Sequence, residues 1–178
     1  RLLTRLSITI RIMVFKRSPM KALIAMSGGV DSSVAAYLMK QQGFDCLGST
    51  MKLYESPGGA EAPPEAAGTC CSLDDTEDAR SVANRLGMPF YVFNYKDEFR
   101  EKVIGNFVES YLSGRTPNPC IECNRHLKFG ALLRRAEELG CDLVVTGHYA
   151  RIVFKDGKYH LLRGLDPGKD QSYVLWNL

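Results

Sequence analysis

The chain has 178 residues, of which 45% are apolar, and this is enough to bury one sizeable core. No apolar run approaches the ~18 residues of a membrane-spanning helix, so we expect no membrane partner. The formal net charge of +3 is misleading, because residues 1–19 hold five bases and no acids, and the rest of the chain is slightly acidic. Any nucleic-acid surface in residues 20–178 must therefore be a local patch.

The basic extension, residues 1–19, has two interpretations. Its arginines and its lack of acids are typical of a mitochondrial transit peptide, whereas its charges interrupt the apolar run too often for a secretory signal. Alternatively, it is a translated upstream region that is disordered or not native, because Met20 and Lys21 stand directly before the first strand. We expect residues 20–178 to form one domain that is truncated, since a new element begins at 171–178.

Strands and helices alternate along the rest of the chain. A Pro- and Gly-rich stretch over 55–68 indicates a flexible loop. Residues 151–154 and 159–162, joined by Lys155-Asp156-Gly157-Lys158, indicate a small C-terminal β-hairpin. We predict strands over 21–26, 45–53, 90–93 and 142–146, and helices over 32–42, 74–86, 97–112 and 127–139. This order predicts an α/β fold with a doubly wound parallel sheet, in which ligands bind at the carboxyl ends of the strands.

The segment Ser27-Gly28-Gly29-Val30-Asp31-Ser32-Ser33 joins the first strand to the first helix. Its glycines allow close backbone approach, and the positive end of the following helix favours anionic oxygens. The three serines add hydroxyl donors, so the segment predicts a polyphosphate site. In the alternative interpretation, Asp31 or Ser32 only caps the helix.

A second constellation spans residues 114–129, where two prolines precede Cys120 and Cys123. We predict that Asn124 caps the following helix and places Cys123 at its positive end, beside Arg125, His126 and Lys128. Such surroundings raise the thiolate fraction of a cysteine.

Two alternatives remain open for these thiols. One is half of a zinc site completed by Cys70-Cys71 or His126, and the other is a thioredoxin-like redox pair. The six cysteines do not predict a disulfide framework, because they lie in an α/β pattern without a secretory signal. We therefore expect the reducing cytoplasm, with mitochondria as the minor alternative.

The loop at 27–33 resembles the PP-loop of the ATP pyrophosphatases, which cleave ATP between the α and β phosphates. From Met20 onward the chain resembles the tRNA-specific 2-thiouridylases of the MnmA type. Further matching stretches are Met51-Lys52, Cys71-Ser72, Asp78-Ala79-Arg80, residues 114–119, Cys123-Asn124, Lys128-Phe129, residues 146–149, residues 162–166 and residues 169–173.

The resemblance implies a PP-loop adenine nucleotide α-hydrolase fold and a defined reaction. ATP adenylates the C2 oxygen of the wobble uridine, position 34 of a tRNA, and a cysteine persulfide then delivers sulfur to that carbon. Cys123 matches the catalytic nucleophile, and the persulfide cysteine lies beyond Leu178. The implied ATP contacts are Ala25, Met26, Ser27, Gly28, Gly29, Val30, Asp31, Ser32, Met51 and Gly147. The implied contacts near the target base are Asn118, Pro119 and Cys120, and those with the tRNA are Lys169, Asp170 and Gln171.

The same resemblance implies tRNAs of the Lys, Glu and Gln type as substrates. It implies a cysteine desulfurase or sulfur carrier as donor, and later tRNA-binding and β-barrel domains without which the chain is inactive. Cys120 stands where the family often has Asp and supplies a second thiol that could form a disulfide with Cys123. Asp31 needs Mg²⁺ between itself and the triphosphate, because both are anionic, and we expect no structural metal.

Several single residues have a structural alternative. Met51 either flanks the adenine ring or fills the core, His148 either reaches the nucleotide or closes a turn, and Tyr149 and Tyr173 either stack on bases or are buried. Two other functions also stay open. One is a PP-loop adenylating enzyme with another acceptor, such as a 4-thiouridine, lysidine or small-molecule enzyme. The other is a non-catalytic zinc- or RNA-binding module.

Overall fold

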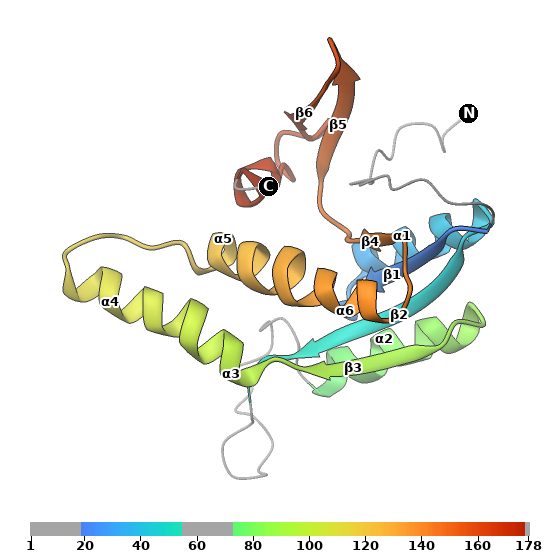
Figure 1. The fold of residues 1–178 in the computed structure, drawn as a ribbon, viewed down its shortest axis with the longest axis horizontal. Helices are drawn as coiled ribbons and strands as arrows, with labels where there is room; N and C mark the ends of the chain where they lie inside the picture. Colours follow the sequence, from blue (N-terminus) through green and yellow to red (C-terminus); the bar gives the residue numbers. More distant parts are fainter. Residues whose placement is uncertain (1–18, 55–72, 177–178) are drawn as a thin grey trace.

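The structure, a computed structural model, describes residues 19–54 and 73–176. Its centre is a parallel sheet of four strands in the order β3-β2-β1-β4 (Figure 1). The strands are β1 (Lys21–Ala25), β2 (Asp45–Lys52), β3 (Phe90–Asn94) and β4 (Leu143–Val145). The order reverses between β1 and β4, which is the switch point where ligands bind in doubly wound sheets. The predicted fold class is confirmed.

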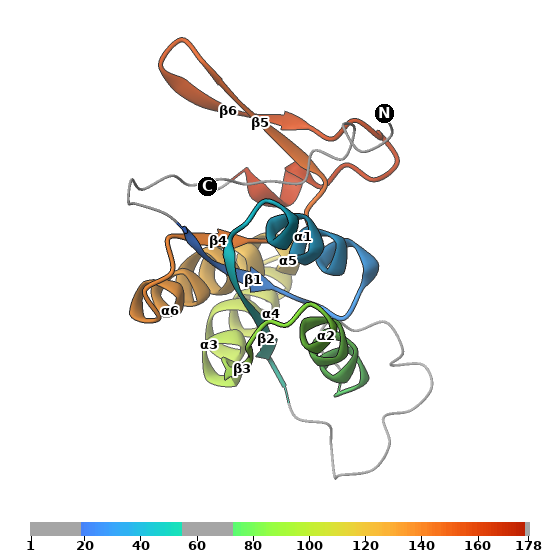
Figure 2. The same cartoon turned by 90° about the vertical axis from the view of Figure 1, so that its right-hand side faces the viewer.

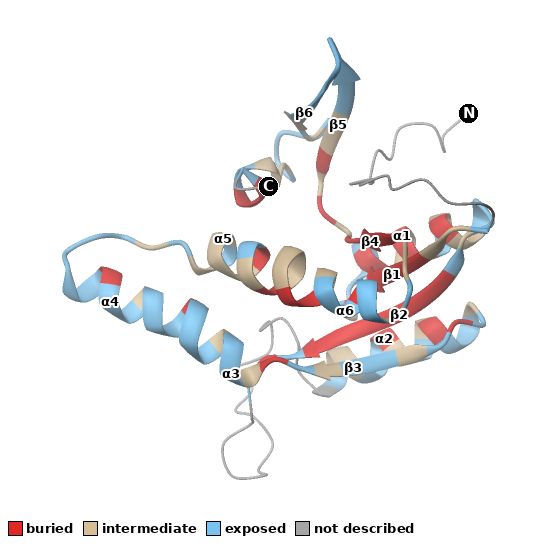
Figure 3. Ribbon diagram, viewed as in Figure 1, coloured by how far each residue is buried: buried red, intermediate tan, exposed pale blue. Residues whose placement is uncertain are grey.

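Helices cover both faces of the sheet (Figure 2). One face carries α1 (Val30–Gln41) and α2 (Leu73–Arg85), and the other carries two longer helical segments. Because side chains alternate along a strand, Ile24 of β1 packs with α1 and α2, while Leu23 packs with the opposite helices. The strands β1, β2 and β4 are therefore mostly buried, whereas the edge strand β3 is largely exposed, as Figure 3 shows.

The first long helical segment follows β3. It consists of α3 (Lys96–Phe99), the π-helical η4 (Arg100–Gly105) and α4 (Asn106–Leu112). These bounds agree with the predicted helix over 97–112. Gly114, with a φ of +72°, lies just after its end.

The second long segment differs from the prediction. It consists of α5 (Pro119–Cys123), the π-helical η5 (Asn124–Ala131) and α6 (Leu132–Glu138), so it begins eight residues before the predicted start at 127. The cap is Asn118, whose side chain accepts a hydrogen bond of 3.0 Å from the Cys120 N–H, and Pro119 occupies the first helical position. The predicted cap at Asn124 is wrong, because Asn124 is buried inside the helix.

The predicted β-hairpin is confirmed, with β5 (Ala150–Lys155) paired antiparallel to β6 (Lys158–Arg163). Asp156 and Gly157 have φ values of 52° and 75°, the positive values that a two-residue hairpin turn with this sequence adopts. A short 3₁₀ helix, η6 (Ser172–Leu175), packs its Val174 and Leu175 against Ala150 at the hairpin base.

Two sequence predictions fall outside the described residues. The flexible loop at 55–68 is one, and the participation of Cys70-Cys71 in a zinc site is the other. Among the residues that are described, no helix is long and apolar enough to cross a membrane.

Candidate nucleotide and thiol site

The loop after β1 depends on Gly28. Its φ is +79°, and a Cβ added there would lie 2.5 Å from the carbonyl oxygen of Asp75 in α2. Gly29 is the cap residue of α1 and has an ordinary extended conformation, with no side-chain hydrogen bond capping the helix. The alternative interpretation, in which Asp31 or Ser32 caps α1, is therefore wrong.

The hydroxyl groups of the loop serines Ser32 and Ser33 form hydrogen bonds within the loop. The hydroxyls of Ser32 and Ser33 donate to the Gly29 carbonyl at 3.0 and 2.9 Å, and the Ser27 N–H donates to the Ser32 hydroxyl at 3.2 Å. The prediction that these hydroxyls serve as ligand donors thus needs correction for Ser32 and Ser33, because their protons hold the loop in shape. Ser27 is exposed.

The donors left for an anion are backbone N–H groups. The first helical bond of α1 is the one from Ser33 N–H to the Gly29 carbonyl, at 3.2 Å. The N–H groups just before it have no carbonyl partner within the helix, and the positive dipole end lies there. Val30, at the first helical position, is 76% exposed, so this end of α1 is open to solvent.

The loop after β4 packs directly against the start of α1. A Cβ added to Gly147 would lie 2.8 Å from both the Asp31 carbonyl carbon and the Ser32 nitrogen, so only glycine allows this approach. The Tyr149 hydroxyl donates a 2.6 Å hydrogen bond to Oδ1 of Asp31. This bond raises the pKa of Tyr149, because ionisation would place two negative charges together.

His148 lies in the same loop after β4 and points into the protein interior. Its side chain is buried, and burial, followed by the nearby Lys128 ammonium, lowers its pKa from 6.5 to about 3. Its Nε2 lies 3.4 Å from Nζ of Lys128, and its Nδ1 lies 2.8 Å from Oγ1 of Thr146. Because an ammonium only donates, we assign a neutral ring that accepts at Nε2 and donates from Nδ1.

The Lys128–His148 contact connects the two constellations that the sequence singled out. Lys128 lies on η5, only five residues after Cys123 and on the same continuous helical segment, and His148 directly follows Gly147. The chain runs from the end of this helical segment into the start of β4. The beginning of the segment therefore lies near the carboxyl end of the sheet. The nucleotide loop and the cysteine helix therefore share one edge of the sheet. Sequence analysis placed Lys128 beside the thiol and missed its contact with His148.

The two cysteines occupy different environments. Cys120 is exposed at the second position of α5, whereas Cys123 is half-buried, one turn further along the same face, and packs against the core that contains Leu127. Cys123 is thus not at the helix N-terminus as predicted, and the helix dipole, which decays within the first turn, favours Cys120 instead. No disulfide joins them or any other cysteines that the structure describes, so the suggested Cys120–Cys123 bond is not supported.

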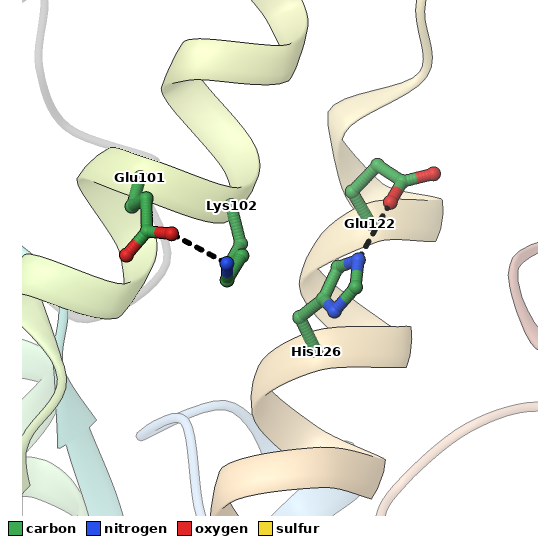
Figure 4. A network of polar contacts seen from close by, with 4 residues as sticks. All are labelled: Glu101, Lys102, Glu122 and His126. Carbon is green, nitrogen blue, oxygen red and sulfur yellow. Dashed lines mark hydrogen bonds and ion pairs between the residues drawn. The ribbon is translucent and has the colours of Figure 1, made fainter.

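The neighbours of these thiols are already engaged. His126 contacts Glu122 at 3.1 Å, one turn away on the same helix, and Figure 4 shows this contact beside the Lys102–Glu101 ion pair of η4. The buried Asn124 donates from Nδ2 to the Cys120 carbonyl at 2.9 Å, but its Oδ1 is buried without a hydrogen-bond partner. Within the described ranges, no group of three His, Cys, Asp or Glu residues could hold a metal ion.

The remaining predicted ATP contacts end or flank β1 and β2. Ala25 is half-buried and Met26 is buried, and the Met26 carbonyl accepts a hydrogen bond from Thr50. Met51 is 5% exposed and its side chain lies in the core with Leu23, so the core alternative is confirmed for this side chain.

The predicted tRNA contacts also have structural roles. The Asp170 carboxylate accepts hydrogen bonds from the Gly164 N–H at 2.7 Å and from Ser172, and these bonds lower its pKa. Gln171 bonds both backbone groups of Tyr149, at 3.0 and 2.9 Å. Only Lys169 stays exposed, with its ammonium 5.3 Å from the centre of the Tyr149 ring.

An open hollow of about 480 Å³ lies between α1 and α2 and reaches the nucleotide loop at Gly28. Its other lining residues are Val30, Ser33, Val34, Tyr37, Asp78, Ser81, Val82 and Arg85. The single acid and single base in this lining give it no clear preference for an anion. We therefore place the phosphate site at the open end of α1 and not in the hollow.

Comparison with known proteins identifies the family. Residues 20–178 match the tRNA methyl transferase HUP domain, so this chain belongs to that family. It is 56% identical over 157 residues to the tRNA-specific 2-thiouridylase MnmA of Clostridium beijerinckii, and 57% identical over 158 residues to that of Clostridium acetobutylicum. These matches cover 88% and 89% of this chain but only 43% and 44% of the relatives.

Solved structures are more distant. A predicted subunit of tRNA methyltransferase from Methanocaldococcus jannaschii aligns with a TM-score of 0.49 and 17% identity, over 85% of this chain and 60% of that one.

Proposed function

We propose that this chain is the ATP-binding and adenylating part of an enzyme that replaces O2 of the wobble uridine in tRNA with sulfur. The observation that carries the proposal is the Lys128–His148 contact, which connects the loop suited to phosphates with the helix that bears Cys120 and Cys123. Relatives that are 56% and 57% identical over 157 and 158 aligned residues are named tRNA-specific 2-thiouridylases, which supports the thiolation chemistry.

In this proposal the phosphates of ATP lie over the open N–H groups of α1, between Ser27 and Ser32. Asp31 fits as a single carboxylate ligand for Mg²⁺, since Mg²⁺ in such sites takes one or two carboxylates together with phosphate oxygens. When bound, the metal neutralises charge on the phosphates. Gly147 keeps the second loop close enough to enclose the nucleotide from the β4 side.

The chemistry has two steps. First, O2 of the uridine attacks the α-phosphorus, a P–O bond forms, and pyrophosphate leaves. Second, the persulfide sulfur attacks C2 and AMP leaves with the former O2, and reduction of the remaining S–S bond by Cys123 would leave the two cysteines as a disulfide. The neutral His148 cannot act as an acid near pH 7, because its pKa is about 3, so we assign it to positioning Lys128.

Further parts of the proposal concern partners. Asn118, Pro119 and Cys120 lie at the exposed start of α5, where a flipped-out uridine of a Lys-, Glu- or Gln-type tRNA would meet them. The sulfur comes from a cysteine desulfurase or a sulfur carrier, through a persulfide cysteine outside these 178 residues. We propose that residues 1–178 bind ATP but do not thiolate tRNA, because they span less than half of the relatives' length.

The test measures AMP release by this chain within a protein of the relatives' length, called the full-length enzyme below, with a persulfide donor supplied because AMP leaves only when sulfur attacks C2. Transcripts with U34 should stimulate AMP release, whereas the same transcripts with C34 should not. Equal stimulation by C34 would favour a lysidine-type acceptor. Stimulation that depends on U8 in place of U34 would favour a 4-thiouridine-type acceptor, and either result would contradict the proposal.

A further inference from the structure

The β5–β6 hairpin offers a surface that the proposed chemistry does not use. It leaves the domain directly after Tyr149 and projects away from the sheet and its helices (Figure 1). Ala150 at its base is buried against η6, and Ile152 is half-buried. Residues 153–161 are all exposed, which gives the hairpin its pale blue tip in Figure 3.

The strand register sorts the exposed side chains into two faces, because directly opposed residues lie on the same face. One face continues outward from the buried base and ends in Phe154 opposite Tyr159. The other face ends in Lys155 opposite Lys158. The tip therefore presents an aromatic pair on one side and a lysine pair on the other.

The aromatic pair is not needed by the core. The two rings contact each other, with centres 4.9 Å apart and planes tilted by 54°. Phe154 is nevertheless 65% exposed and Tyr159 is 62% exposed. Exposed rings on an element that also carries exposed lysines are typical of surfaces that bind unpaired bases together with their phosphates.

The charge of the hairpin contrasts with that of the rest of the domain. Its four bases, Arg151, Lys155, Lys158 and Arg163, face a single acid, Asp156. Lys155 and Lys158 repel each other across the turn, and no ion pair reaches either of them in the part of the chain that is described. A polyanion would relieve this repulsion, whereas protein interfaces are depleted in lysine.

We propose that the hairpin tip is an additional tRNA contact, in which Lys155 and Lys158 bind backbone phosphates and Phe154 and Tyr159 stack on an unpaired base. This inference rests on the proposed function, because it takes tRNA as the substrate. A strand of six residues spans roughly 20 Å, so the tip meets the tRNA well away from the reacting uridine. Such a contact adds affinity and leaves the chemical step unchanged.

The experiment measures tRNA affinity of the full-length enzyme by fluorescence anisotropy at several salt concentrations. For Lys155→Ala/Lys158→Ala we expect affinity to fall several-fold and the log-log salt slope to drop by about 1.4–1.8, the value for two phosphate contacts. The control Lys40→Ala/Lys102→Ala removes the same charge from α1 and η4 and should bind like wild type.

The aromatic pair is tested with Phe154→Leu/Tyr159→Leu, which keeps apolar side chains but cannot stack. We expect affinity to fall at least about 5-fold with the salt slope unchanged. Melting temperature should stay within error in both hairpin variants, because the replaced side chains are exposed. AMP release at saturating tRNA should also match wild type.

Four results would overturn the inference. Wild-type affinity in both hairpin variants would show that the hairpin does not contact tRNA, and it would leave the proposed function intact. An equal loss in the control would indicate diffuse charge, and lowered stability with unchanged affinity would indicate that another protein surface packs on the tip. If wild type itself does not bind tRNA, the proposed function fails together with the inference.

Discussion

The Tyr149 hydroxyl donates a hydrogen bond of 2.6 Å to Asp31, which lies 118 residues earlier in the chain. This bond joins the two loops at the switch point and occupies a carboxylate oxygen that we assign to the Mg²⁺–ATP site. The two uses compete, since an oxygen that accepts from a phenol binds a cation less well.

We therefore predict that Tyr149→Phe strengthens Mg²⁺–ATP binding by a few-fold, the size of one net hydrogen bond. Isothermal titration calorimetry of the wild-type and variant chains measures the change. Tyr173→Phe is the matched control. Tyr173 is exposed at η6 and is far from Asp31 in the sequence, and the hydroxyl that donates to Asp31 belongs to Tyr149. Weaker binding by Tyr149→Phe would mean that the bond positions Asp31 for the ligand.

The two loop glycines should respond very differently to alanine. Gly28→Ala places a Cβ against the Asp75 backbone at a positive φ, which we expect to destabilise the fold by roughly 1–3 kcal/mol and to abolish ATP binding. Gly29→Ala meets only the Ser27 hydroxyl at 3.6 Å, an ordinary contact, and should fold normally. Thermal melts with and without ATP compare the two variants, and equal behaviour would contradict the loop geometry.

The buried His148 makes stability depend on pH. Its pKa is about 3 in the folded chain and near 6.5 when unfolded, so the unfolded state binds more protons between these values. The free energy of unfolding should therefore fall as pH drops from 6.5 towards 3, by up to about 4 kcal/mol.

Chemical denaturation across this pH range tests that dependence. His148→Gln should flatten the curve, while His160→Gln, which replaces an exposed hairpin residue, should keep the wild-type slope. Parallel curves for His148→Gln and wild type would show that His148 is not the buried neutral group inferred from its contacts.

Sequence analysis predicted those features that depend on neighbours along the chain. The alternation of strands and helices, the Asp156-Gly157 turn and the conformational need at Gly28 follow from local patterns. The start of the cysteine helix was misplaced, because Pro117 and Pro119 indicated a connector although proline is also favoured at the first helical position. The Lys128–His148 and Tyr149–Asp31 contacts join distant segments, and no local pattern predicts them.

The two cysteines should differ in importance. Cys120→Asp should retain most thiolation activity, because Cys120 is exposed and stands where the family often has Asp. Cys123→Ser should not form 2-thiouridine, because a hydroxyl near pH 7 is a far weaker nucleophile than a thiol. Quantifying 2-thiouridine in tRNA digests from both variants decides this, and loss confined to the Cys120 variant would reverse the assignment.

The most direct test counts AMP and 2-thiouridine in the same reaction of the full-length enzyme. Wild type should form both, and Asp31→Asn should lose both by about 10²–10³-fold, because Asp31 acts at the adenylation step. Cys123→Ser should release AMP in the presence of U34 tRNA only up to about one equivalent per enzyme, because the S–S bond to the tRNA is not cleaved, and should form no free 2-thiouridine. AMP release at the wild-type rate by Asp31→Asn, or full thiolation by Cys123→Ser, would contradict the division of the site into an adenylating loop and a thiol helix.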